Sequence, residues 1–140
     1  MILTCNFEEV TALGHGARSF LSEPTETRSA VAAPCETRGA VEVLLTQLSG
    51  DLSVHTLSEQ RQLRIALEAV VELLREEMRA EVLATHPASE EAVAAYFAFA
   101  HALSVLDRVT EMGEEMAALV ELLTGAPPDN AMVQHFHFPD

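Results

Sequence analysis

Two long segments with helical periodicity, separated by only a few residues, constrain the fold of this 140-residue chain more than any other feature. In the first, the capping sequence Thr56–Glu59 precedes apolar residues that recur every three or four positions, which predicts a helix over about 57–84. His86 and Pro87 follow, and a residue before proline avoids the helical conformation, so we expect the helix to stop there.

The second segment begins at Ser89, a favourable N-cap residue, and is expected to be helical as far as Thr124. Gly125 and the prolines that follow it end the helix, because glycine adopts the left-handed conformation at a helix C-terminus and proline cannot continue the helix. Two long helices joined by so few residues predict an antiparallel hairpin over about 57–84 and 89–124.

The N-terminal part of the chain predicts one short strand and one short helix. Residues 1–5 form an apolar run that is compatible with a strand. Asn6 and Glu9 then have the spacing of a helix N-cap, and the apolar residues after them predict a helix over about 7–21. Gly14 and Gly16 weaken this helix by roughly 1 kcal/mol each relative to alanine, but they also permit another helix to approach closely.

Residues 22–56 carry weaker signals. Prolines and a glycine make 22–39 the least regular part of the chain. In 40–56, two β-compatible runs flank the turn sequence Ser49-Gly50-Asp51, which favours a β-hairpin. The alternative is a helix, because one helical face would carry the apolar side chains of Val41, Leu44, Leu45 and Leu48.

These elements predict one domain over residues 1–140 of a mainly helical α+β class, with the long hairpin, the short first helix and a few minor strands; an all-α bundle is the alternative. The chain is 49% hydrophobic, which suffices for an ordinary core. Residues 126–140 are expected to form an extended C-terminal tail beside residues 1–5 or over the hairpin. Alternation there places Phe136 and Phe138 opposite His135 and His137.

The stretch 92–106 contains fifteen consecutive uncharged residues in a chain of which 21% is charged. It is too short to cross a bilayer, so we expect it to be enclosed by protein on most sides, either by a small sheet or by a second copy of the chain. A symmetric dimer with a four-helix core would cover it. The residues that we expect at such an interface are Phe97, Phe99, Met112 and Met116.

His101 lies within this stretch and is the candidate for a ligand or acid/base role, because imidazole titrates near neutrality. A ligand site around it would draw on Tyr96, Arg108 and Glu111 of the same helix. The simpler interpretation is a hydrogen-bonded histidine at the edge of a solvated face. A di-iron bundle is not predicted, because the residue three positions before His101 is Ala98 and not glutamate.

No cofactor is predicted from sequence motifs. His135 and His137 have a spacing that can chelate a divalent metal on one side of a strand, but two histidines at this spacing also arise by chance. The chain has no nucleophile-elbow motif and no glycine-rich phosphate loop. We therefore predict no catalytic residue.

Net charge limits the classes of partner. The 22 acidic and 8 basic residues give −14, which disfavours direct binding to nucleic acid or to anionic lipid and favours a basic protein partner. No membrane span or signal peptide is expected, and Cys5 and Cys35 match no metal-binding spacing, so both are expected to be free buried thiols in a cytoplasmic protein.

These observations predict a small acidic, non-enzymatic interaction or regulatory module that forms a homo-oligomer, most simply a homodimer, through its helical hairpin. The alternative is a small-molecule or metal-binding protein, with or without catalysis, whose site surrounds His101. A third hypothesis is an acidic mimic of nucleic acid, which the net charge of −14 permits.

Overall fold

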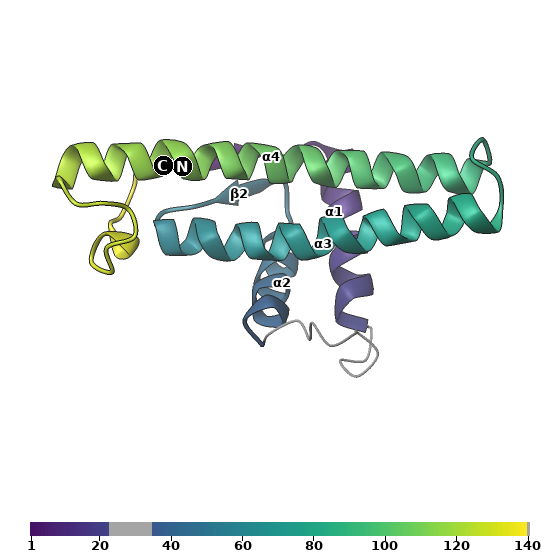
Figure 1. Cartoon of the computed structure of the whole chain (residues 1–140), viewed down its shortest axis with the longest axis horizontal. Coiled ribbons are helices and arrows are strands. Elements are labelled where there is room, and N and C mark those ends of the chain that lie inside the picture. Colours follow the sequence, from purple (N-terminus) through teal and green to yellow (C-terminus); the bar gives the residue numbers. More distant parts are fainter. Residues whose placement is uncertain (23–34, 140) are drawn as a thin grey trace.

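The computed structural model describes residues 1–22 and 35–139 and confirms a mainly helical α+β fold (Figure 1). Its elements, in chain order, are β1 (Ile2–Thr4), α1 (Phe7–Ser22), α2 (Cys35–Gln47), β2 (Asp51–Ser53), α3 (Leu57–Ala84), α4 (Glu90–Thr124) and the 3₁₀ helix η1 (Val133–His135). The predicted helical hairpin is α3 and α4, which lie side by side, with the C-terminal end of α4 extending beyond the start of α3 (Figure 1). Most of the segment expected to be irregular, 22–39, lies outside the described residues, but 35–39 belong to α2.

Both hairpin helices begin and end at the predicted caps. The Thr56 hydroxyl accepts a hydrogen bond from the backbone N–H of Glu59 at 3.1 Å, and the Ser89 hydroxyl accepts one from Ala92 at 3.1 Å. Gly125 follows α4 with φ +70°, and its N–H donates to the carbonyl of Glu121. These caps satisfy donors and acceptors that a helix end otherwise leaves free, which is why the sequence located the helices correctly.

Helix α1 crosses the hairpin steeply, next to α2 (Figure 1). Its N-terminus is a reciprocal capping box, in which Glu9 N–H donates to Asn6 Oδ1 at 2.8 Å and Asn6 N–H donates to Glu9 Oε1 at 2.9 Å. The close approach expected at the glycines occurs at Gly16, where an added Cβ would lie 2.6 Å from Val70 Cγ1 of α3. At Gly14 an added Cβ would meet only Arg18 of the same helix.

The β-hairpin favoured over 40–56 is wrong. Residues 40–47 continue α2, because burial of Ala40, Val41 and Leu44 against α1 and α3 selects the helical face over the β-compatible alternation. The turn at Gly50, φ +136°, was located correctly, but it connects a helix to strand β2.

Strand β2 pairs with β1 in an antiparallel two-stranded sheet, in which Leu3 faces Leu52. The expected strand within residues 1–5 is therefore confirmed, with β2 as its partner. The tail contacts the same region, since Phe138 N–H donates to the carbonyl of His55 at 2.6 Å and the Met1 ammonium donates to the carbonyl of Pro139 at 3.1 Å. Phe138 is buried and Phe136 is partly buried, whereas the two tail histidines are exposed. The tail is not extended throughout, however, because Val133–His135 form the 3₁₀ helix η1.

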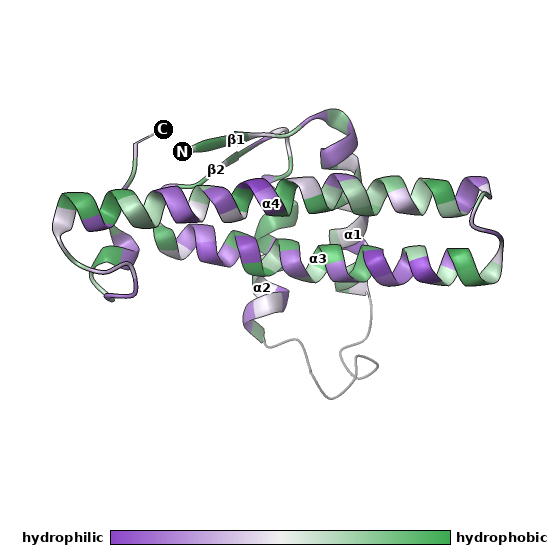
Figure 2. Cartoon of the chain, turned by 45° about the horizontal axis from the view of Figure 1, so that its top comes forward, coloured by the Kyte–Doolittle hydropathy of each residue, from purple (hydrophilic) through white to green (hydrophobic). Residues whose placement is uncertain are grey.

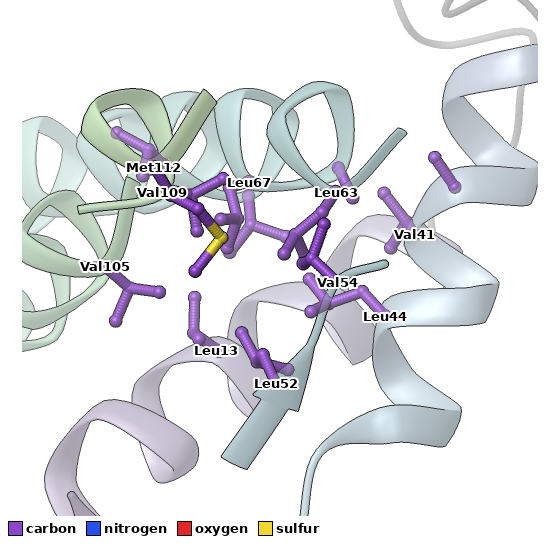
Figure 3. Close-up of a cluster of buried hydrophobic side chains, with 14 of the residues drawn as sticks. Leu13, Val41, Leu44, Leu52, Val54, Leu63, Leu67, Val105, Val109 and Met112 are labelled. Carbon is purple, nitrogen blue, oxygen red and sulfur yellow. The ribbon is translucent and has the colours of Figure 1, made fainter. Parts of the chain in front are cut away.

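The core lies at the centre of the hairpin, where all the larger elements meet (Figure 3). Side chains from α1, α2, β2, α3 and α4 interdigitate there. The fully buried ones include Leu13, Val41, Leu44, Leu52, Val54, Leu67, Val105 and Val109. Only the middle of the hairpin is covered in this way.

The end of the hairpin that carries the turn between α3 and α4 projects beyond α1, and we call residues 75–97 the hairpin arm (Figure 1). Ala92 is the one buried residue within it. Of the two expected ways to enclose residues 92–106, the small sheet is wrong, because the sheet lies beside the second half of α4 and leaves the first half open. Enclosure by a second copy stays a prediction. Figure 2 shows the mostly hydrophobic colouring of this half of α4.

By length and composition alone, α4 is long and apolar enough to cross a membrane. In its most apolar stretch of 18 residues, 22% of the residues are buried. Fifteen uncharged residues of helix extend about 22 Å at 1.5 Å per residue. A hydrocarbon core is about 30 Å thick, so this uncharged part is shorter than a bilayer requires.

The α3–α4 seam yields a stability prediction at Gly113. The buried Gln60 side chain lies across this position and its Nε2 donates to the carbonyl of Val109 at 3.0 Å. A Cβ at residue 113 would lie 2.3 Å from that Nε2. We expect Gly113→Ala to lower the free energy of unfolding by about 1–3 kcal/mol in urea titrations, because overpacking outweighs the gain in helix propensity.

The matched control is Gly39→Ala in α2, where nothing lies within 4 Å of an added Cβ. This variant should gain about 0.5–1 kcal/mol. Equal effects of the two substitutions would contradict the close contact between Gln60 and Gly113.

Candidate functional site

A groove of about 1120 Å³ lies between α1 and the hairpin arm. It exists because α1 crosses the hairpin at Gly16 and then leaves the projecting arm uncovered. Small side chains from all three helices line it, and we refer to them together as the alanine floor: Ala12, Ala80, Ala94, Ala95 and Ala98. Phe7 and Phe97 line it as well, and both are exposed.

One polar contact joins α1 to the arm across the groove. His15 Nε2 lies 2.9 Å from Glu77 Oε2, and both side chains are substantially exposed. His101 also lines the groove, partly buried, with its ring centroid 6.4 Å from that of Phe97. No local pattern assigns His15 a role, because its partner Glu77 is 62 residues away along the chain.

Arg108, which the sequence placed near His101 in a ligand site, instead binds the start of α1. Its Nη2 forms an ion pair with Glu9 Oε2, and its Nη1 donates to the carbonyl of Thr4 at 2.8 Å. Glu9 is only 5% exposed, so its carboxylate depends on these donors for compensation. One carboxylate thus caps α1 and connects it to α4.

The other two candidates for that ligand site lie elsewhere. Tyr96 does not line the groove and is 53% exposed. Glu111 is exposed ten residues after His101, which corresponds to about 15 Å along a helix. The structure therefore does not assemble His101, Arg108, Tyr96 and Glu111 into one site.

The four residues expected at an interface also separate into two groups. Phe97 is 54% exposed on the arm, whereas Phe99 is partly buried with its ring 5.4 Å from the guanidinium carbon of Arg75. Met112 and Met116 are buried in the core of the single chain, so a second protein cannot reach them.

The tail histidines lie at the opposite end of the hairpin from the arm. The His137 ring stacks on His55 at 5.0 Å between centroids, with 12° between their planes, while His135 belongs to η1. Within residues 1–22 and 35–139, no cluster of three or more His, Cys, Asp or Glu side chains is arranged to hold a metal ion.

Cys5 is buried beside the Glu9–Arg108 pair, while Cys35 is exposed, which corrects the expectation that both thiols would be buried. Burial raises the pKa of the Cys5 thiol, and the charge of Glu9 adds to this increase. Because the thiolate is the reactive form, Cys5 should react slowly in the folded protein.

We therefore expect monobromobimane at pH 8 to label the native chain once, at Cys35. Cys35→Ser should show almost no labelling until the protein is unfolded in urea. Rapid native labelling of Cys35→Ser would contradict the burial of Cys5.

The Glu9–Arg108 pair predicts that alanine substitutions of different arginines lower the free energy of unfolding by different amounts. Arg108→Ala leaves a buried carboxylate without its cation and should cost about 1–3 kcal/mol of unfolding free energy. The control is Arg79→Ala, because Arg79 pairs with Glu76 at an exposed position. Loss of this exposed ion pair should lower the free energy of unfolding by less than about 0.5 kcal/mol. Similar losses in chemical denaturation would show that the buried pair does not hold α1 against α4.

Comparison with known proteins adds no further constraint on this site. The chain matches no protein-family model, no curated protein and no solved structure at a significant level. Its function must therefore be argued from the geometry described above.

Proposed function

We propose that this chain is a small acidic, non-enzymatic interaction module that forms a homodimer through the first half of α4. The observation that carries the proposal is an apolar stripe on α4, which we call the outer stripe and which consists of Val93, Tyr96, Ala100 and Leu103. The first two side chains are exposed and the last two are partly buried. Spacings of three, four and three residues align such positions along one face of a helix. Val93 is 40% exposed and Tyr96 is 53% exposed, so two large side chains of the stripe face solvent in the single chain.

Charge supports a second copy as the occupant of this stripe. A chain with net charge −14 repels its own copies over most of its surface. Residues 92–106 carry no charge, so two copies can approach there without placing like charges in contact. Two hairpins packed along their outer stripes form a symmetric four-helix arrangement, which is a common solution for uncovered helical hairpins.

The same proposal places the module in the cytoplasm, which its two free cysteines support. It binds neither nucleic acid nor membrane directly, because its net charge of −14 repels the phosphate groups of both. It requires no cofactor.

Native mass spectrometry and light scattering test the dimer directly. We expect twice the 15.2 kDa mass of one chain at tens of micromolar, with little weakening at higher salt because the buried surface is uncharged. Tyr96→Glu buries a carboxylate from each copy and should weaken dimerisation at least a hundredfold, on the order of 3 kcal/mol.

The matched control is Leu122→Glu, which makes the same kind of change at an 80% exposed position of α4 outside the outer stripe. This variant should remain dimeric. A wild-type chain that stays monomeric at several hundred micromolar, or equal effects of the two substitutions, would refute self-association through the outer stripe.

A further inference from the structure

The groove between α1 and the arm lies on a different side of α4 from the outer stripe. Its α4 residues include Ala94, Phe97 and His101, and it includes no residue of that stripe. Self-association through the outer stripe therefore leaves the groove open to a second protein. What the groove can hold follows from its size, its floor and its charges.

The size and floor of the groove match a helix. An α-helix with its side chains is about 10 Å across, so a volume of 1120 Å³ corresponds to roughly 14 Å of helix, or two to three turns. The alanines of the floor permit the backbone of an incoming helix to lie close to α1 and α4. Phe7 and Phe97 provide exposed aromatic surface for its apolar side chains.

The charges around the groove specify a basic partner. Glu8, Glu81 and Glu91 line it, and within the described residues none of these three carboxylates takes part in an ion pair. Glu77 is already bound to His15, and Arg18 contributes the one guanidinium in the lining. Lysine or arginine side chains that flank an apolar helical stripe would meet the three free carboxylates.

A second copy of this chain fits the groove less well. The exposed apolar segment that it would insert begins with Glu90 and Glu91, which would approach the carboxylates of Glu8 and Glu81. Like charges at an interface oppose association. The net charge of −14 adds long-range repulsion to a copy and long-range attraction to a cation.

We propose that this groove binds a basic amphipathic helix of a partner protein, two to three turns of which lie on the alanine floor. This binding rests on the proposed role as an interaction module and names the class of its partner, but it uses a separate face of α4. The dimer then presents two such grooves, one on each copy.

The test uses a fluorescein-labelled 14-residue peptide of leucine, alanine and lysine, with leucines at helical spacing and lysines beside them, read by fluorescence anisotropy. We expect the full-length protein to bind this peptide at least tenfold tighter than two controls. One control has the same composition in a scrambled order, and the other has glutamate in place of lysine. Binding should weaken by about tenfold between 50 and 300 mM NaCl, because the contacts at the rim are ionic.

Two sets of variants locate the binding in the groove. The triple substitution Glu8→Gln, Glu81→Gln and Glu91→Gln should weaken peptide binding about tenfold, since each surface charge contributes a factor of roughly two to five. The matched control changes the same number of exposed carboxylates on the far half of α4, through Glu114→Gln, Glu115→Gln and Glu121→Gln, and should change binding less than twofold. Ala94→Trp, at an exposed position of the groove, should block binding sterically.

Equal binding of the scrambled peptide, or equal losses in the two triple variants, would overturn the proposal, because the attraction would then be general and not located in the groove. Loss of the dimer in Ala94→Trp would also overturn it, since a second copy would then occupy the groove. The dimer proposal is tested separately. We expect Tyr96→Glu to be monomeric and still to bind the peptide, because the groove includes no residue of the outer stripe. A monomeric wild-type chain that binds the peptide refutes the dimer alone.

Discussion

The packing of α3 against α4 is the interaction on which the rest of the structure depends. The buried side chains of one helix, such as Leu67 and Val70, interdigitate with those of the other, such as Val109 and Met116. Helices α1 and α2 and the small sheet bury their own apolar residues only against the centre of this seam. A hairpin longer than the elements that cover it leaves an arm, and both faces proposed here as binding surfaces are consequences of that difference in length.

Much of the fold could be predicted because its signals are local. The caps at Thr56, Ser89 and Gly125 act within four residues, so the ends of both long helices were located almost to the residue. Helix α2 was misjudged because its apolar residues suit a strand as well as a helix, and only burial against α1 and α3 decides between them. The strand in residues 1–5 was predicted, but its partner β2 lies about fifty residues away and carries no sequence signal for the pairing.

The candidate site was less accessible from the sequence than the fold. The uncharged stretch 92–106 suggested a need for cover, and the structure leaves some of its side chains exposed, such as Val93 and Tyr96, while it buries others, such as Ala102 and Val105. The groove itself depends on how α1 crosses the hairpin, where Gly16 lies close to Val70, and no local pattern in the sequence predicts this crossing. The ligand-site hypothesis included Arg108 because its actual partner, Glu9, is 99 residues away in the sequence. The predicted capping role of Glu9 uses only one of its carboxylate oxygens, Oε1, and the other oxygen binds Arg108.

The arm is stabilised almost entirely by its own two helices, since Ala92 is its one buried residue. Its backbone hydrogen bonds can therefore open while the central core stays intact, so the chain has a region of low local stability attached to one of high stability. Local opening of this kind gives weak protection from hydrogen exchange, so the amide protons of the arm are expected to exchange faster than those of the fully buried Val70 and Val109. A molecule that occupies either face of α4 adds contacts to the arm, so its binding opposes this local opening.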